Sequence, residues 1–369
     1  MVTPRYLPLM GGIETHVYEV GRRLARANLH ITILTTDRTG QLPRDETSEG
    51  MQIRRVRAYP ASADVYFAPE IYREIVTGTW DVVHCQGIHT FVPPLAMLAA
   101  LRAHIPFVVT FHTGGHSTGW RNAVRGLQWR TLRPLLARAQ RLIGVSQFEA
   151  DLFQQHLHLP REKFTVIPNG GSLPPLPNGA PARNGAALIL SVGRLEKYKG
   201  HHRVLRAMPH VLESVPNARL LILGTGPYEA ALKKLADEYR VAERVEIRAV
   251  PAKDRAQMAT ILASATLIVL LSEYEAHPIA VMEALALGRP VLVADTSGLR
   301  ELAQRGLVRA IPLNSSPTQI ADTILAQLRE PLIPPPVQLP TWEECAEALR
   351  AVYAGVTKDE GQDANFNAH

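Results

Sequence analysis

Two glutamates stand where carboxylates could bind a phosphorylated, hydroxyl-rich ligand. Glu275 and Glu283 flank a short turn between an apolar run at 266–271 and a predicted helix that begins near Pro278, a residue that a first helical turn tolerates. A helix N-terminus that follows a strand holds phosphates through its N–H groups, and nearby carboxylates accept hydrogen bonds from sugar hydroxyls. Glu283 lies about 1.5 turns into this helix, so its side chain leans back toward the helix start. Two glutamates on a solvated helix start would give the same pattern.

Two cations follow a second apolar run. Arg194 comes directly after Gly193, and Lys199 comes five residues later. Arginine offers a forked donor and lysine a compact charge, so together they suit a diphosphate and stabilise a leaving nucleotide. Two exposed cations are the alternative. Gly224 and Gly226 permit a tight turn beside this site, but the third glycine of a dinucleotide-binding fingerprint is missing.

The first half of the chain offers weaker signals. Gly11 and Gly12 open a helical pattern, where glycine lets the backbone approach a ligand closely, although a simple loop fits equally well. His112 comes just past the C-terminal end of a predicted strand, on the edge of a parallel sheet that carries function. A capping or loop histidine would look the same. His84 ends the neighbouring strand and either has a structural role or lines an acceptor site.

Strands and helices alternate along most of the chain, which predicts an α/β fold with doubly wound parallel sheets. A length of 369 residues suggests two domains. The expected domains are 1–171 and 186–330, joined by a linker at 172–185 that is rich in Pro, Gly, Asn and Ala. A terminal helix is expected at 338–356, and residues after Lys358 resemble a disordered or tag-like end. The expected strands are 31–36, 52–57, 82–85, 107–111, 141–145, 188–192, 219–223, 245–250, 266–271, 291–294 and 308–311.

These motifs resemble the retaining GT-B glycosyltransferases of family 4. The segment from Gly193 to Gly200 is similar to the family's Gly-Arg-x4-Lys-Gly motif, and the resemblance covers residues 4–355. The chain departs from the family at His277 and Pro278, where Phe and Gly are frequent, which leaves the donor sugar open. The residues that match the Glu-x7-Glu signature are Ser272, Glu275, Glu283, Ala284, Gly288, Pro290 and Val291.

The resemblance implies the GT-B fold: two Rossmann-like domains that face a central cleft, with a terminal helix that crosses back to the first domain. The first domain would bind the acceptor and the second a nucleotide-diphosphate sugar. It assigns catalysis to His112, Arg194, Lys199 and Glu275. It assigns donor binding to Gly11, Gly12, Gly193, Gly224, Gly226, Val250, His277, Pro278, Ile279, Ala280 and Glu283, and weaker acceptor contacts to Glu14, His84 and Thr113.

The implied reaction transfers a hexosyl unit with retention, and the departing phosphate acts as the base. Glu283 would bind the ribose, and Glu275 the sugar ring. Because no Asp-x-Asp motif occurs and two cations can neutralise the diphosphate, we expect no metal requirement and no cofactor. UDP-glucose, UDP-N-acetylglucosamine and GDP-mannose are all compatible donors. A GT-B sugar-nucleotide epimerase, a phosphorylase and a non-catalytic nucleotide-sugar-binding protein are the alternatives.

The charge is uneven, since residues 1–170 hold 19 Lys and Arg against 13 Asp and Glu, while 171–369 hold 21 of each. A basic half suits an anionic partner such as a phosphorylated acceptor, an acidic glycan, a lipid surface or nucleic acid, although plain surface arginine would give the same excess. With the family resemblance, we expect a sugar, a glycolipid or another small molecule as the acceptor, and no nucleic acid. The segment 120–141 is predicted to be a basic amphipathic helix that packs in the core or contacts an anionic membrane. Cys85 and Cys345 fit no metal or disulfide spacing, and neither a membrane span nor a signal peptide is evident. We therefore expect a cytoplasmic protein, either in solution or peripheral at the inner membrane face.

Overall fold

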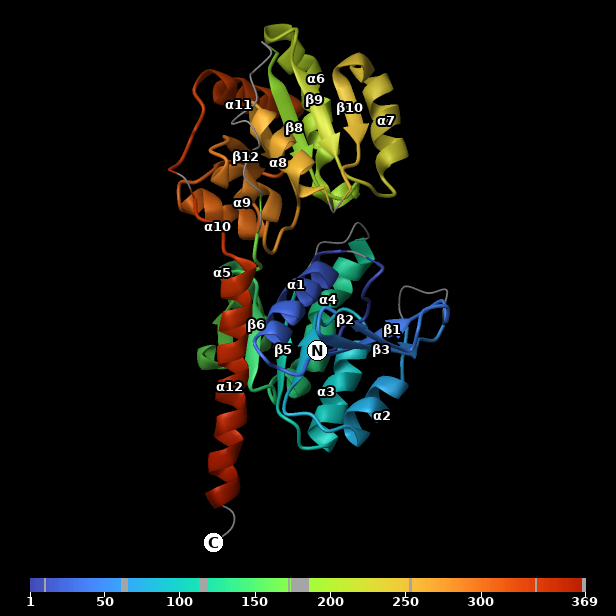
Figure 1. Ribbon diagram of the computed structural model, residues 1–369. Coiled ribbons are helices and arrows are strands. Elements are labelled where there is room, and N and C mark those ends of the chain that lie inside the picture. Colours follow the sequence, from blue (N-terminus) through green and yellow to red (C-terminus); the bar gives the residue numbers. More distant parts are fainter. Residues whose placement is uncertain are drawn as a thin grey trace. The chain divides into compact units, whose positions relative to one another are not determined.

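The computed structural model describes residues 1–9, 11–60, 66–112, 119–171, 173, 186–251, 254–335 and 337–366, without the side chains of 119–125 and 358–366. The chain forms two compact units (Figure 1). Unit 1 comprises Met1–Thr113, Trp120–Gly170 and Pro340–His369, and unit 2 is mainly Gly171–Leu339. Each unit is an α/β layer structure built on its own sheet, so the predicted fold class is confirmed. The expected linker at 172–185 lies outside the described residues except for Leu173.

The sheet of unit 1 has the order β2-β3-β1 and then β4-β5-β6-β7. Val2 joins the two parts, since it forms parallel bridges with Leu34 of β1 and Cys85 of β4. Among the strands of the described residues, the edge strand β2 alone runs antiparallel to its neighbour. It was missed because its four residues are polar and lack apolar alternation. The strands are β1 (Thr32–Asp37), β2 (Asp45–Ser48), β3 (Met51–Arg57), β4 (Val83–Gln86), β5 (Phe107–Thr110), β6 (Arg141–Gly144) and β7 (Phe164–Val166).

Helices cover both faces of this sheet. One face packs against α2, α3, α4 and α5, and the other packs against α1 and the C-terminal helix α12. Leu349 of α12 is buried with Val17 and Leu24 of α1 in the second cluster. The helix α12 runs from Trp342 to Phe366, so it begins later than the expected helix at 338–356 and continues past its expected end into residues that were expected to be disordered. The helices are α1 (Gly12–Arg26), α2 (Glu70–Thr77), α3 (Val92–Arg102), α4 (Gly119–Leu136), α5 (Gln147–Leu157) and α12 (Trp342–Phe366).

Unit 2 contains a six-stranded, fully parallel sheet in the order β10-β9-β8-β11-β12-β13. The helices α6, α7 and α11 pack on one face, and α8, α9 and α10 pack on the other. Successive residues of β9 alternate between the two cores, as a doubly wound sheet requires. The strands are β8 (Leu188–Val192), β9 (Arg219–Leu223), β10 (Val245–Arg248), β11 (Leu267–Leu270), β12 (Val291–Ala294) and β13 (Arg309–Ile311). The helices are α6 (His201–Ser214), α7 (Glu229–Glu238), α8 (Arg255–Ser264), α9 (Ile279–Ala286), α10 (Ser297–Gln304) and α11 (Pro317–Arg329).

Because neighbouring strands in each sheet run parallel, the loops that follow their carboxyl ends meet at one edge. Those loops carry most of the residues that the sequence selected in each unit. In the described part of the chain, no helix has both the length and the apolar character needed to cross a membrane.

Candidate active site

In unit 2, the loop after β8 contacts the loop after β11. Lys199 Nζ donates to Glu275 Oε1 at 2.7 Å, and the two side chains are 16% and 12% exposed. The backbone adds a second connection, because the N–H of Glu273 donates to the carbonyl of Tyr198 at 2.8 Å. A cation and a carboxylate from two separate motifs are therefore in contact at the ligand-binding edge of the sheet.

Gly200 lets these loops approach each other. Its φ is +75°, a left-handed conformation that glycine adopts without steric strain. A Cβ added here would lie 1.9 Å from the carbonyl oxygen of Leu271. Any larger residue would therefore force the end of β11 away from the Lys199 loop.

Three surrounding groups hold Glu275 in place besides Lys199. Ser272 Oγ donates to Glu275 Oε1 at 2.8 Å. The N–H of Glu275 donates to Ser297 Oγ at 2.8 Å, and the N–H of Gly298 donates to the carbonyl of Glu275 at 2.9 Å. Ser297 has a φ of +43°, an unusual value for a residue other than glycine. Both the backbone and the carboxylate of Glu275 are thus fixed before any ligand binds, as preorganised sites require.

Arg194 has a different environment. Its side chain is 66% exposed and its Nη2 lies 2.8 Å from Glu196 Oε1. Arg194 and Lys199 were expected to act together on one diphosphate. Among the described residues, Lys199 contacts Glu275, whereas Arg194 pairs with Glu196 instead. A long exposed side chain pairs with the nearest carboxylate at little energetic gain, so Arg194 is free to reorient toward an anion.

The loop after β9 packs against the loop that carries Arg194. A Cβ on Gly224 would lie 1.9 Å from the carbonyl oxygen of Gly193, so only glycine permits this approach. Gly226 follows in the same turn, and the N–H of Leu195 donates to the carbonyl of Thr225 at 2.9 Å. The three selected glycines therefore shape the loop that carries Arg194.

Glu283 forms an ion pair that the sequence analysis missed. Its side chain is 5% exposed and accepts a hydrogen bond from Arg255 Nη2, at the start of α8. Burial raises the pKa of Glu283, and the nearby charge of Arg255 opposes that rise. The one sequence signal for this pair was an arginine in a first helical turn after Asp254, whose side chain caps α8.

The turn before α9 contains a buried polar atom without a partner. His277 Nδ1 has no hydrogen-bond partner among the described residues, and burial lowers the pKa of His277 to about 4. Pro278 is the N-cap of α9, and Ile279 and Ala280 form its first turn. Val250, after β10, packs partly buried against the core beneath. A buried ring nitrogen without a partner beside a helix start is an arrangement that suits a polar ligand.

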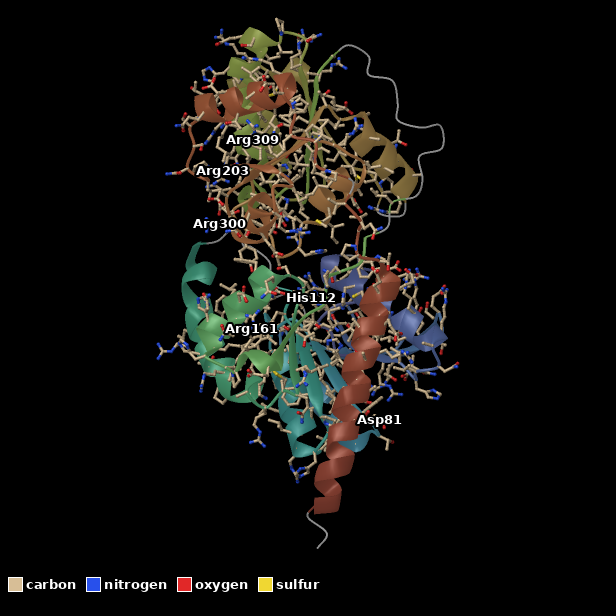
Figure 2. All side chains as sticks on the ribbon, turned by 90° about the vertical axis from the view of Figure 1, so that its left-hand side faces the viewer. Asp81, His112, Arg161, Arg203, Arg300 and Arg309 are labelled. Carbon is tan, nitrogen blue, oxygen red and sulfur yellow. The ribbon has the colours of Figure 1, made fainter. Side chains whose placement is uncertain are left out.

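In unit 1, His112 lies directly after β5, at the carboxyl edge of the sheet (Figure 2). Its backbone is left-handed, with a φ of +48°. Its Nε2 lies 2.7 Å from Gln86 Oε1, and its ring meets that of His16 edge-on at 4.5 Å between centroids. Burial, followed by the neighbouring histidines, lowers the pKa of His112 well below the ordinary value. His112 is therefore a neutral ring in a polar cluster, and the strand position of Gln86 was the only sequence signal for its partner.

The start of α1 lies at the same edge. Gly11 is the N-cap in an extended conformation, and a Cβ on Gly12 would meet no atom within 4 Å. Glu14 is 7% exposed and its Oε1 lies 3.7 Å from Arg5 Nε. Open space therefore lies beside Gly12, whereas a Cβ on Gly11 would lie 2.5 Å from Glu14 Oε2. Thr113, the remaining predicted acceptor contact, lies outside the described residues.

His84 lies in the interior of unit 1. It is 2% exposed, its Nδ1 is 2.5 Å from Tyr353 Oη, and its Nε2 is 2.8 Å from Thr110 Oγ1. Both ring nitrogens bond within the chain, which fits the structural alternative for this residue.

Among the described residues, no group of three or more His, Cys, Asp and Glu side chains is arranged to hold a metal ion. The carboxylates and cations near the two sheet edges instead pair with one another. The expectation that the reaction needs no metal stays a prediction.

The chain is similar to known proteins. Residues 10–172 match the family model described as Glycosyltransferase Family 4, and residues 177–339 match that of Glycosyl transferases group 1. The GDP-mannose:cellobiosyl-diphosphopolyprenol alpha-mannosyltransferase of Xanthomonas oryzae is 29% identical over 82% of this chain and 80% of that protein.

Solved structures share the fold. Sucrose-phosphate synthase from Thermosynechococcus elongatus has a TM-score of 0.66 at 20% identity, over 97% of this chain and 94% of that one. HepE of Anabaena, solved with UDP and glucose, has a TM-score of 0.65 at 15% identity, over 99% and 98% of the two chains. The two family models together span both units and carry the motifs located above. The chain belongs to the family 4 glycosyltransferases, enzymes with the GT-B fold.

Proposed function

We propose that the protein is a retaining, metal-independent hexosyltransferase that uses a UDP- or GDP-sugar and acts in the cytoplasm. The observation that carries the proposal is the contact between Lys199 and Glu275, fixed by Ser272 and Ser297 at the carboxyl edge of the unit-2 sheet. A buried cation and carboxylate side by side can bind the two ends of a sugar diphosphate, one the phosphate and the other the sugar hydroxyls.

Each group has a role in this proposal. Lys199 and Arg194 stabilise the negative charge that develops on the diphosphate as the bond from the sugar anomeric carbon to its oxygen breaks. Glu275 orients the sugar ring, and Glu283 accepts from the ribose hydroxyls. The acceptor oxygen bonds to the anomeric carbon on the same face, and its proton passes to the departing diphosphate. Retention follows because entry and departure share one face.

The nucleotide base of the proposed donor is either uracil or guanine. The Xanthomonas relative is named for GDP-mannose and the Anabaena structure contains UDP and glucose, so the similar proteins favour neither base. His277 stands next to the start of α9, where the family often has phenylalanine. Its Nδ1 has no partner among the described residues, so it can bind one hydroxyl of the sugar and distinguish sugars that differ at that position.

A panel of ligands tests the proposal. UDP, GDP, ADP and their hexose derivatives are each added in a thermal-shift assay, because a ligand that binds only the folded state raises the unfolding temperature. The donor that stabilises most is then incubated with glycan acceptors, with and without EDTA, and the product anomer is read by NMR. Binding and transfer with retention in EDTA are expected. A new sugar nucleotide without acceptor would indicate an epimerase, and binding without any turnover would indicate a binding protein.

The basic helix α4 supports a second, smaller proposal: a peripheral contact with anionic lipid. In its described part, Leu127 is 66% exposed while Trp129 and Leu136 are buried, so one side packs in the core and another faces solvent. Sedimentation with vesicles of phosphatidylglycerol and phosphatidylcholine tests this, with Leu127→Glu expected to reduce binding. Equal amounts of the native protein and of Leu127→Glu in the supernatant would exclude the contact.

A further inference from the structure

A continuous set of hydrogen bonds connects His112 to the C-terminal helix. Gln86 Oε1 lies 2.7 Å from His112 Nε2, and Gln86 Nε2 lies 3.2 Å from His84 Nε2. His84 Nε2 also lies 2.8 Å from Thr110 Oγ1, and His84 Nδ1 lies 2.5 Å from Tyr353 Oη. The path therefore starts at the edge of the sheet, runs along strand β4 from Gln86 to His84 and ends on α12.

The orientation of the Gln86 amide in the structure assigns the ring protons. An amide oxygen only accepts, so His112 Nε2 carries a proton. An amide nitrogen only donates, so His84 Nε2 is a lone pair and the proton of His84 is on Nδ1, where it donates to Tyr353 Oη. Each neutral ring carries one proton, which leaves His112 Nδ1 unprotonated. Burial lowers the pKa of both His84 and His112 well below the ordinary value, consistent with neutral rings.

This hydrogen-bonded cluster occupies buried positions at which apolar side chains would cost less free energy. Gln86, Thr110 and His84 are 0%, 1% and 2% exposed, in a sheet whose neighbouring positions are Val and Cys. Buried polar side chains cost free energy unless each is hydrogen-bonded. The left-handed backbone of His112 adds strain, and the nearby His89 Nε2 lies 3.3 Å from the His112 carbonyl oxygen. Strain and buried polarity at one point favour a role in function over a role in packing.

We propose that Gln86 and His84 are positioning residues, locked by Tyr353 of α12, that present His112 to the substrate with its proton on Nε2 and its lone pair on Nδ1. This proposal rests on the proposed transferase function, in which Nδ1 accepts a hydrogen bond from a substrate hydroxyl. The last helix of the chain thereby sets the state of a ring that lies on a different element.

Removal of one distant hydroxyl tests the connection. Tyr353→Phe keeps the aromatic ring, which packs edge-on to His84 at 5.6 Å, and deletes only the acceptor for His84 Nδ1–H. His84 then has no reason to keep its proton on Nδ1, so the amide can reverse and His112 becomes a mixture of tautomers. Tyr6→Phe is the matched control, because Tyr6 is buried in the same unit and its hydroxyl has no partner among the described residues.

The measurement is the ¹⁵N resonance pattern of the histidine rings in the full chain, with His112 assigned by its loss in His112→Gln. The expected result is an Nε2–H tautomer in the native protein and in Tyr6→Phe, and averaged shifts in Tyr353→Phe and Gln86→Leu. A native His112 with its proton on Nδ1, or shifts unchanged by both variants, would overturn the proposal. Thermal unfolding of each variant separates these results from loss of fold.

Kinetics give an independent readout. Tyr353→Phe is expected to lower kcat about 5- to 10-fold with less than about a twofold change in the KM of the donor, because an orientation effect acts on the reacting state. Equal changes in Tyr6→Phe would indicate a structural effect only. The NMR test needs no turnover. A protein without transferase activity would contradict the proposed function, and the NMR result would still decide whether His112 is positioned as proposed.

Discussion

Lys199 and Glu275 lie 2.7 Å apart at Nζ and Oε1, although 76 residues separate them in the chain. Their contact joins the two motifs that carry most of the sequence evidence. Both side chains are largely buried, so the pair is screened little by solvent. Under the proposed function, catalysis and local stability depend on the same contact, and substitutions there should change both.

Replacement of Lys199 by alanine is expected to lower turnover by two or more orders of magnitude, because a cation that stabilises the leaving diphosphate is lost. It should also lower the free energy of unfolding by about 1–3 kcal/mol, since Glu275 keeps Ser272 but loses its cation. Steady-state kinetics and urea unfolding measure the two effects. Lys197→Ala, at an exposed neighbouring lysine, is the control.

A double-mutant cycle with Glu275→Ala completes that test. The combined variant should be destabilised by less than the sum of the single variants, because the second change removes the unpaired charge. Strict additivity would show that the contact contributes nothing to stability.

Glu283→Ala should mainly weaken nucleotide binding. Arg255, its partner, is 39% exposed and can be hydrated when the carboxylate is absent, so the fold should tolerate the change. The expected outcome is loss of most of the rise in unfolding temperature produced by the nucleoside diphosphate. Glu238→Ala, an exposed carboxylate on α7, should keep the full shift. A normal shift in Glu283→Ala would remove Glu283 from the ribose site.

Arg194→Ala separates ligand binding from folding. Because its side chain is 66% exposed and pairs only with a near neighbour, stability should change by less than about 0.5 kcal/mol. Donor affinity should nevertheless fall about 10-fold, as expected for loss of a charged hydrogen bond to a phosphate. Arg219→Ala, at the amino end of β9 and thus on the opposite sheet edge, should leave affinity unchanged. Calorimetric titration with the diphosphate distinguishes the two variants.

The buried histidines predict how stability varies with pH. Burial lowers the pKa of His16 from 6.5 to about 4, and its hydrogen bond with Asn169 opposes that shift only partly. The unfolded chain therefore binds a proton below pH 6.5 that the folded chain does not, and stability falls as the pH drops toward 4. One such group contributes a loss of about 2 kcal/mol between pH 7 and pH 5.

His16→Asn tests this dependence, because asparagine can still donate to Asn169 but does not titrate. Its unfolding free energy should fall less steeply between pH 7 and pH 5 than that of the native protein. If the pH dependence of the unfolding free energy were the same in both proteins, folding would not lower the pKa of His16.

The sequence was most informative where chemistry and periodicity coincide. Strand β11 with Glu275 and Glu283, and strand β8 with Lys199, could be located because apolar runs end in glycine or charge at the sheet edge. The partners of these residues could not be predicted. Arg255 reaches Glu283 across two helices, and Gln86 reaches His112 across two strands, so both contacts depend on tertiary packing that has no local signature. The short polar strand β2 was missed for a related reason. It forms a strand because it pairs with β3, and its residues have little intrinsic preference for strands.

The return of α12 to unit 1 has a consequence for biosynthesis. All strands and helices of unit 2 lie before Leu339, whereas unit 1 needs Trp342 and Leu349 to close its core beside α1. During translation unit 2 can therefore complete its fold before α12 emerges, whereas the α1 side of the unit-1 sheet is fully covered only once α12 is made. A chain that stalls before that helix would expose the apolar surface of α1, which makes it a natural target for chaperones.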